Sequence, residues 1–189
     1  TINEKTIKDI ESIAQIPIAF EVNRILSPKV VEDGLGGIAF LEQDIDVSYI
    51  KDYDNSPGEG PTQWAKRFKI SNWGLIVAEQ RDQIIGSVVI AMNTQGLRML
   101  RGRKDLAVLW DIRITPSHRN QGVGTKLFEA AERWAKFHGC IQINIETQNI
   151  NLPACRFYSK LGCELIEINR QAYRKHPNEI QLIWAKSLS

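Results

Sequence analysis

The chain has 189 residues, of which 43% are hydrophobic and 24% are charged, with a formal net charge of only +2 at pH 7. This ordinary globular composition, in a chain long enough to bury a sizeable core, predicts one domain over residues 1–189. The near balance of charge argues against a dedicated nucleic-acid binder, and no apolar run approaches the roughly 18 residues that a membrane helix needs. No basic start with an apolar middle opens the chain, so we expect no signal peptide.

Two periodicities divide the chain into expected strands and helices. Alternating apolar and polar residues, or short apolar runs, predict strands. In chain order these are residues 16–26, 38–47, 73–78, 84–92, 106–115, 140–147, 164–174 and 179–187. A spacing near 3.6 residues predicts helices. These are residues 3–15, where the pattern is weak, 62–69, 122–138 and 151–161.

The order of these elements indicates the fold class. Residues 73–78 and 84–92 read as a hairpin across a loop at residues 80–83. Gly86, inside the second of these strands, predicts a bulge or a close approach of another backbone. The strand–helix–strand order over residues 106–147 predicts a right-handed parallel crossover. The result is an α/β (α+β) domain on a mixed, mostly antiparallel sheet with one parallel strand pair.

The three cysteines are odd in number and match no zinc spacing, so the sequence indicates no metal site. They are Cys140, Cys155 and Cys163. We interpret them as reduced thiols in the core of a cytoplasmic protein, because disulfides are rare in that compartment. A reactive thiol is the alternative interpretation.

Two charged segments each have two interpretations. Six acidic residues between positions 42 and 59 form either a solvated face or an acidic rim that attracts a cationic substrate. They are Glu42, Asp44, Asp46, Asp52, Asp54 and Glu59. Residues 93–105 are rich in arginine and lysine. They form either a solvated extension of a hairpin or a contact for the phosphate of a ligand.

A glycine loop follows the strand at residues 106–115 and opens the helix at residues 122–138. Its pattern is Arg119-x-x-Gly122-x-Gly124. Glycines let a backbone approach a ligand closely, and the N–H groups at the head of the following helix would all point one way. A Walker loop is excluded because no Gly-Lys-Ser/Thr follows, and the dinucleotide fingerprint fails at Leu127. The loop therefore predicts a site for a ligand that carries a pyrophosphate.

A second motif lies downstream and reads Asn151-x-x-Ala-x-x-Phe157-Tyr158-x-x-x-Gly162. Asn151 can cap the helix that begins there. With both motifs in this order, the chain resembles the GNAT family of acetyl-CoA-dependent N-acetyltransferases. The family's loop is Arg/Gln-x-x-Gly-x-Gly/Ala, and its later signature ends in Gly-Phe, where this chain has Cys163. The resemblance implies the GNAT fold, in which helices flank a mixed central sheet whose parallel strands splay at one end.

The resemblance also implies which residues bind acetyl-CoA. In the family the pantetheine arm enters the splay and pairs with backbone of the first splayed strand, which here would be Ile112, Arg113 and Ile114. Asn151 would contact the same arm. The pyrophosphate loop would comprise Arg119, Asn120, Gln121, Gly122, Val123, Gly124 and Thr125.

Acetyl transfer to an amine needs a base for the ammonium proton, donors for the carbonyl oxygen and an acid for the leaving thiolate. Tyr158 is the candidate acid, because in the family this tyrosine points at the cofactor sulfur; packing alone is the alternative. Glu146 and Asp111 are the candidate bases, and Glu146 is preferred because it lies opposite three isoleucines on its strand. Either carboxylate could instead hold a second cationic amine of the substrate or be structural. Tyr173 and His176 would lie near the substrate entrance, and neither is assigned a role.

Within the family, the chain looks most like the streptothricin acetyltransferases. Glu146-Thr-Gln-Asn-Ile-Asn-Leu-Pro-Ala-Cys155 is close to that subfamily's Glu-Thr-Gln-x-x-Asn-x-x-Ala-Cys, whereas Trp110 stands where the subfamily commonly has Glu. The resemblance predicts acetyl transfer from acetyl-CoA to a primary amine of a small cationic acceptor, such as a streptothricin-like antibiotic, by direct attack in a ternary complex. A protein or peptide N-acetyltransferase and a non-catalytic acyl-CoA-binding module are the alternatives. The expected partner is a small-molecule amine, not nucleic acid or a membrane, and a monomer and a homodimer both stay open.

Overall fold

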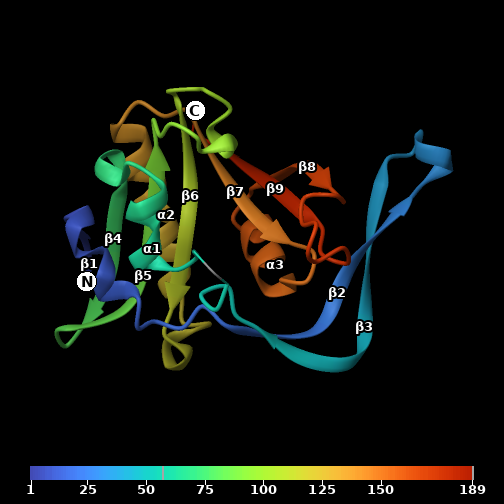
Figure 1. The fold of residues 1–189 in the computed structure, drawn as a ribbon, viewed down its shortest axis with the longest axis horizontal. Helices are drawn as coiled ribbons and strands as arrows, with labels where there is room; N and C mark the ends of the chain where they lie inside the picture. The colour runs from blue at the N-terminus through green and yellow to red at the C-terminus, as the bar shows by residue number, and fades with distance from the viewer. Residues whose placement is uncertain (57, 189) are drawn as a thin grey trace. The chain divides into compact units, whose positions relative to one another are not determined.

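The computed structural model of the protein describes residues 1–56 and 58–188 (Figure 1). Contacts divide the chain into two compact units. The first unit comprises Thr1–Ala19, Asp52–Ile145 and the chain from Ala185 on, and the second comprises Phe20–Lys51 and Glu146–Trp184. Each unit combines segments that are far apart in sequence, so the division does not cut the chain into consecutive domains. One domain over residues 1–189 stays a prediction.

The first unit is built on a mixed sheet. Its strands are β1 (Ile2–Lys5), β4 (Gly74–Gln80), β5 (Gln83–Met92), β6 (Leu106–Ile114) and the first part of β7 (Gln142–Gln148), hydrogen-bonded in the order β1-β4-β5-β6-β7. Strands β1, β4, β5 and β6 pair antiparallel, and β6 pairs with β7 in parallel. The green and yellow strands β4, β5 and β6 lie side by side in Figure 1. The predicted mostly antiparallel sheet with one parallel pair is confirmed.

Helix α2 (Val123–Phe137) connects the two parallel strands and contacts β4, β5 and β6. Its buried residues include Leu127, Ala131 and Trp134, at the spacing that the sequence predicts. Phe137, an apolar residue three positions after Trp134, is 87% exposed. The position four residues after Trp134 belongs instead to His138, whose ring centroid lies 3.9 Å from that of Trp134.

Short helices and loops of the first unit provide a second group of buried residues, in addition to those of α2. These helices are η1 (Ile7–Ile13), α1 (Pro61–Arg67), η3 (Ile70–Asn72) and η4 (Arg98–Leu100); a further short helix, η5 (Pro116–His118), follows β6 and buries none of its residues. Ile13, Trp64 and Leu100 from these helices join residues of β4, β5 and β6 in one apolar cluster. Residues 93–105, predicted to be a solvated hairpin extension or a phosphate contact, are anchored in that cluster by Leu97 and Leu100.

The helix predicted over residues 3–15 is a correction. The segment begins as strand β1, which pairs antiparallel with β4, and continues as the 3-10 helix η1. Tertiary pairing at a sheet edge overrides the local pattern in the first part. In the second part Ile7, Ile10 and Ile13 recur every three residues, which is the period of a 3-10 helix rather than of an α-helix.

The second unit contains a two-stranded ribbon and a smaller helix–strand group. Strands β2 (Phe20–Val30) and β3 (Ile38–Lys51) pair antiparallel and are joined across η2 (Glu32–Gly34). Strand β3 runs four residues past the predicted end at residue 47. Strand β2 is as long as the strand predicted over residues 16–26 but lies four residues further on, because Pro28 is tolerated in a ribbon where it pairs opposite Phe40. Helix α3 (Leu152–Lys160) precedes β8 (Glu164–Asn169) and β9 (Gln181–Ser187), and the hydrogen-bonded order is β7-β9-β8. None of the helices in the described part of the chain has the length and apolar character to cross a membrane.

Candidate active site

The glycine loop has the geometry that the sequence predicts. Strand β6 ends at Ile114, η5 follows, and α2 begins at Val123 with Gly122 as its N-cap residue. Gly122 has a φ of 79°, a left-handed conformation that favours glycine, and a Cβ there would meet no atom within 4 Å among the described residues. The first-turn N–H groups of α2 have no carbonyl partner inside the helix, and Gly122 has no side chain that could cap them. The space at the Cβ position of Gly122 is thus open at the head of α2, where main-chain donors can bind an anion.

The side chain of Arg119 is directed back onto the protein. Its guanidinium donates to the carbonyl oxygen of Ile114 at 3.1 Å, to that of Pro17 at 3.0 Å and to that of Ala19 at 3.4 Å. These bonds tie the start of the loop to the end of β6 and to the segment before β2. The side chain of Arg119 therefore holds the loop in place. A contact between Arg119 and the pyrophosphate stays a prediction, and it would be made by the main chain.

Strand β5 has both features predicted at Gly86, a bulge and a close approach of another backbone. Ala78 pairs with Gly86 and Glu79 with Ile84, so Ile85 is the extra residue of a bulge in β5. A Cβ on Gly86 would lie 3.1 Å from the carbonyl oxygen of Arg113 and 3.3 Å from Val123. Gly86 thus permits the close approach of β5 to the end of β6 and the start of α2.

The backbone of Ile112, Arg113 and Ile114, predicted to bind the pantetheine arm, pairs on one side with β5. The parallel ladder with β7 covers Leu106–Leu109 and ends before these three residues. Binding of the arm to this stretch stays a prediction.

Asp111, one of the two candidate bases, lies in a buried ion pair. The Arg113 guanidinium donates to both carboxylate oxygens of Asp111, at 2.8 and 2.7 Å. The side chain of Asp111 is 4% exposed and that of Arg113 is 0% exposed. Arg113 also donates to Asp54 at 2.9 Å and to the carbonyl oxygen of Ile16 at 3.0 Å. Burial alone would lower the pKa of Arg113, but the hydrogen bonds and charge of Asp111, and then of Asp54, outweigh it and raise the pKa. This geometry supports the structural interpretation of Asp111.

Glu146, the other candidate base, lies in the second unit in a network of neutral donors. The Tyr173 hydroxyl donates to its Oε1 at 2.5 Å, and the Gln181 amide donates to its Oε2 at 2.8 Å. The Gln148 amide donates to the Tyr173 hydroxyl at 2.8 Å and approaches Glu146 Oε1 at 3.4 Å. The sequence singled out Glu146 and left Tyr173 unassigned. It gave no signal for Gln181, which is 35 residues away and reaches Glu146 only through the fold.

Helix α3 carries the second motif in the second unit. Asn151 is its N-cap residue, and its side-chain oxygen accepts from the Ala154 N–H at 3.2 Å, as predicted. Tyr158 is 4% exposed, and its ring packs edge-on against Phe157 at a centroid distance of 5.2 Å. The cofactor contact of Asn151 and the acid role of Tyr158 stay predictions.

All three cysteines are buried free thiols, as the sequence predicts. Burial raises the pKa of Cys155 to about 11, partly offset by its hydrogen bond with Thr147. Burial, and then the charge of Asp105, raises the pKa of Cys140. A raised pKa lowers the thiolate fraction, so these shifts favour the interpretation as core thiols over that as reactive thiols.

Arginine neutralises most of the acidic residues between positions 42 and 59. In the second unit, Arg24 contacts Glu42 and Asp44, and Arg156 also contacts Glu42. In the first unit, Asp54 pairs with Arg113 and Glu59 with Arg67. These pairs support the interpretation as structural and solvated residues over that of a free acidic rim.

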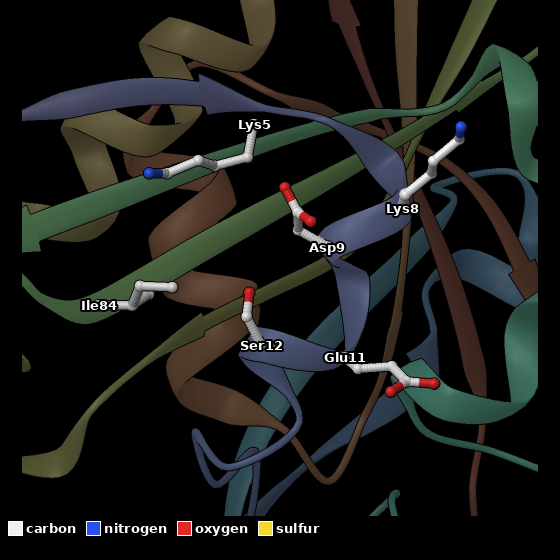
Figure 2. Close-up of a pocket in the computed structure, with 6 residues that line it drawn as sticks. All are labelled: Lys5, Lys8, Asp9, Glu11, Ser12 and Ile84. Atoms are coloured by element: carbon white, nitrogen blue, oxygen red, sulfur yellow. The ribbon is translucent and has the colours of Figure 1, made fainter.

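A pocket of about 440 Å³ lies in the first unit, and none of the predicted site residues lines it. Its lining residues are Lys5, Lys8, Asp9, Glu11, Ser12 and Ile84. Figure 2 shows that the polar side chains point in different directions and do not converge on one point. The pocket therefore offers no arrangement for chemistry.

The structure thus groups the predicted residues by unit. The glycine loop, Ile112–Ile114 and Asp111 belong to the first unit, and Glu146, Asn151 and Tyr158 belong to the second. Inside the first unit Asp111 meets Arg113, and inside the second Glu146 meets a tyrosine and two glutamines.

Comparison with known proteins adds the family. The acetyltransferase (GNAT) family profile matches residues 40–163. Streptothricin acetyltransferase A of Bacillus subtilis (strain 168) is 29% identical over 147 residues, which are 77% of this chain and 69% of that protein. The streptothricin acetyltransferase of Escherichia coli is 37% identical over 83 residues, which are 42% of this chain and only 48% of that protein.

A solved structure agrees with these sequence relatives. It is provisionally named a streptothricin acetyltransferase, from Bacillus anthracis str. Ames, and is in complex with acetyl coenzyme A. It superposes with a TM-score of 0.76 at 26% identity and covers 99% of this chain and 98% of its own. The family, fold and cosubstrate that the two motifs predicted are confirmed. The chain belongs to the acetyltransferase (GNAT) family and is an acetyl-CoA-dependent N-acetyltransferase.

Proposed function

We propose that the enzyme acetylates a primary amine of a small cationic acceptor, in the chemical class of streptothricin, by direct attack in a ternary complex with acetyl-CoA. The observation that carries this proposal is the Glu146 carboxylate, which neutral donors hold at both oxygens. A fixed carboxylate can take the proton of an ammonium group or hold a second amine by its charge. The similarity to proteins named streptothricin acetyltransferases supports the acceptor class.

The glycine loop fits the pyrophosphate of acetyl-CoA. The left-handed Gly122 leaves the space at its Cβ position open, and the first-turn N–H groups of α2 are donors without helical partners. Acetyl-CoA supplies the acetyl group and the thiolate that leaves. We assign its pyrophosphate to residues 119–125 and its pantetheine arm to Ile112–Ile114 and Asn151.

Two side chains move protons in the proposed reaction. Glu146 accepts the proton of the acceptor's ammonium group, directly or through a water molecule, so that the amine can attack. Tyr158 gives a proton to the leaving thiolate, whose conjugate acid has a pKa of about 8.5 against about 10 for a phenol. Asp111 takes no part in proton transfer, because Arg113 holds both of its oxygens. The three free thiols fit a reaction in the cytoplasm.

The test is release of free coenzyme A thiol from acetyl-CoA, measured with streptothricin and with a panel of small amines, polyamines and basic peptides. We expect turnover with streptothricin or with another small cationic amine. Turnover with basic peptides alone would indicate a peptide acetyltransferase. Tight binding of acetyl-CoA without turnover on any acceptor would contradict the proposal and favour a binding module.

A further inference from the structure

Tyr173 lies in the loop between β8 and β9 and is the only side-chain hydroxyl that the described residues place on the Glu146 carboxylate. We infer that Tyr173 is a positioning residue for Glu146: its phenol fixes the direction in which the carboxylate faces the acceptor amine. This inference rests on the proposed function, because it gives Tyr173 a role only if Glu146 is the working carboxylate.

The hydrogen bonds from Gln148 through Tyr173 to Glu146 form a chain in which each donor points toward Glu146. The Gln148 amide donates to the Tyr173 oxygen at 2.8 Å, and the Tyr173 hydroxyl donates to Glu146 Oε1. A donor that itself accepts a hydrogen bond is polarised and donates more strongly. The Gln181 amide holds Oε2 at 2.8 Å, so both oxygens are fixed and the carboxylate cannot rotate without breaking a bond.

The number of donors leaves room for an acceptor. An ionised carboxylate has about four lone-pair positions. The phenol and the two glutamine amides, one of them at 3.4 Å, occupy up to three of these positions. Among the residues that the structure describes, these donors therefore leave at least one lone-pair position for an ammonium proton, and its direction is set by the bonds to the others.

The loop that carries Tyr173 is itself anchored. Asn149, three residues after Glu146, forms two hydrogen bonds with Ile180. The Asn149 N–H donates to the carbonyl oxygen of Ile180 at 3.0 Å, and the Ile180 N–H donates to the side-chain oxygen of Asn149 at 2.8 Å. Glu179 forms a largely buried ion pair with Lys51 at 2.6 Å. The Tyr173 hydroxyl is thus held on a loop tied to the strand that bears Glu146, which is what a positioning role requires.

The experiment compares Tyr173→Phe with Glu146→Gln, with the double variant and with Tyr49→Phe as matched control. Tyr49 is 44% exposed on β3 in the same unit and has no part in the proposed chemistry. For Tyr173→Phe we expect kcat/KM for the acceptor to fall about 10- to 100-fold, the scale of a misplaced reacting group. The KM for acetyl-CoA and the unfolding midpoint should match those of Tyr49→Phe.

Two further readouts separate positioning from simple packing. The limb on which activity rises with pH should change in Tyr173→Phe and stay as in wild type in Tyr49→Phe, because Tyr173 contacts the Glu146 carboxylate. The double variant should be no slower than Glu146→Gln, because both changes remove the same function.

The outcomes distinguish the inference from the proposed function. If Glu146→Gln is impaired while Tyr173→Phe behaves like Tyr49→Phe, the inference is overturned and the proposed role of Glu146 stands. If the two losses multiply in the double variant, Tyr173 acts independently of Glu146 and the inference is again overturned. If Glu146→Gln keeps full activity and an unchanged pH profile, the proposed base is wrong and the inference falls with it.

Discussion

Strands β6 and β7 each carry a carboxylate, Asp111 and Glu146, and the partners of the two differ in charge. The fully buried guanidinium of Arg113 donates hydrogen bonds to both oxygens of Asp111. Glu146 is half-buried, and a phenol and amides hold it. The charge of Asp111 is matched by that of Arg113, and removal of either partner would leave the other buried without its counter-charge. The donors that the described residues provide to Glu146 are neutral, which fits the role that we propose for its charge toward a cationic acceptor.

The largest effect is expected at the charged pair. Asp111→Asn should lower the free energy of unfolding by about 3–5 kcal/mol, because it removes a charged partner of a buried guanidinium. Chemical denaturation measures this loss. Glu146→Gln is the matched control and should unfold close to wild type. A stable Asp111→Asn protein with an altered pH–activity profile would reverse the roles that we give to the two carboxylates.

The next effect concerns the acid that should act together with Glu146. Tyr158→Phe should lower turnover by about 10²-fold, the usual scale for loss of a positioned acid. Affinity for acetyl-CoA, measured by calorimetry, should change little. Equal turnover in the variant and the wild type would mean that another group or water protonates the thiolate.

The smallest effect is expected at an exposed pair with similar bond lengths. Arg24 donates to Asp44 at 2.7 Å, but the side chains are 44% and 77% exposed. The hydrogen bond and charge of Asp44 raise the pKa of Arg24, yet water can replace the partner when it is removed. Asp44→Asn should therefore leave the unfolding midpoint at the wild-type value. A loss as large as that of Asp111→Asn would show that burial does not distinguish the two pairs.

Local signals were sufficient for much of the fold. The glycine loop, the cap at Asn151 and the short hairpin turn between β4 and β5 are fixed by residues within a few positions of one another. These features follow from backbone preferences that each residue carries with it. For the same reason, the bulge beside Gly86 could be predicted from a glycine inside an apolar strand.

Features that depend on distant segments could not be predicted. Strand β1 exists because the edge of β4 accepts it, 70 or more residues away in sequence. Arg113 was expected only as backbone, whereas Asp54 and the carbonyl oxygen of Ile16 make its side chain the centre of a buried network. The partners of Glu146 come from 27 and 35 residues further on. The sequence thus indicated the candidate residues, but it could not predict which of the two carboxylates has a charged partner.

The most direct test of this account is the pH dependence of acceptor kcat/KM for Glu146→Gln, followed by coenzyme A thiol release. If Glu146 is the base, the folded variant binds acetyl-CoA like wild type but has lost most of its turnover, together with the limb on which activity rises with pH. Wild-type turnover with an unchanged profile would contradict it and would leave the amine's proton to solvent or to another group.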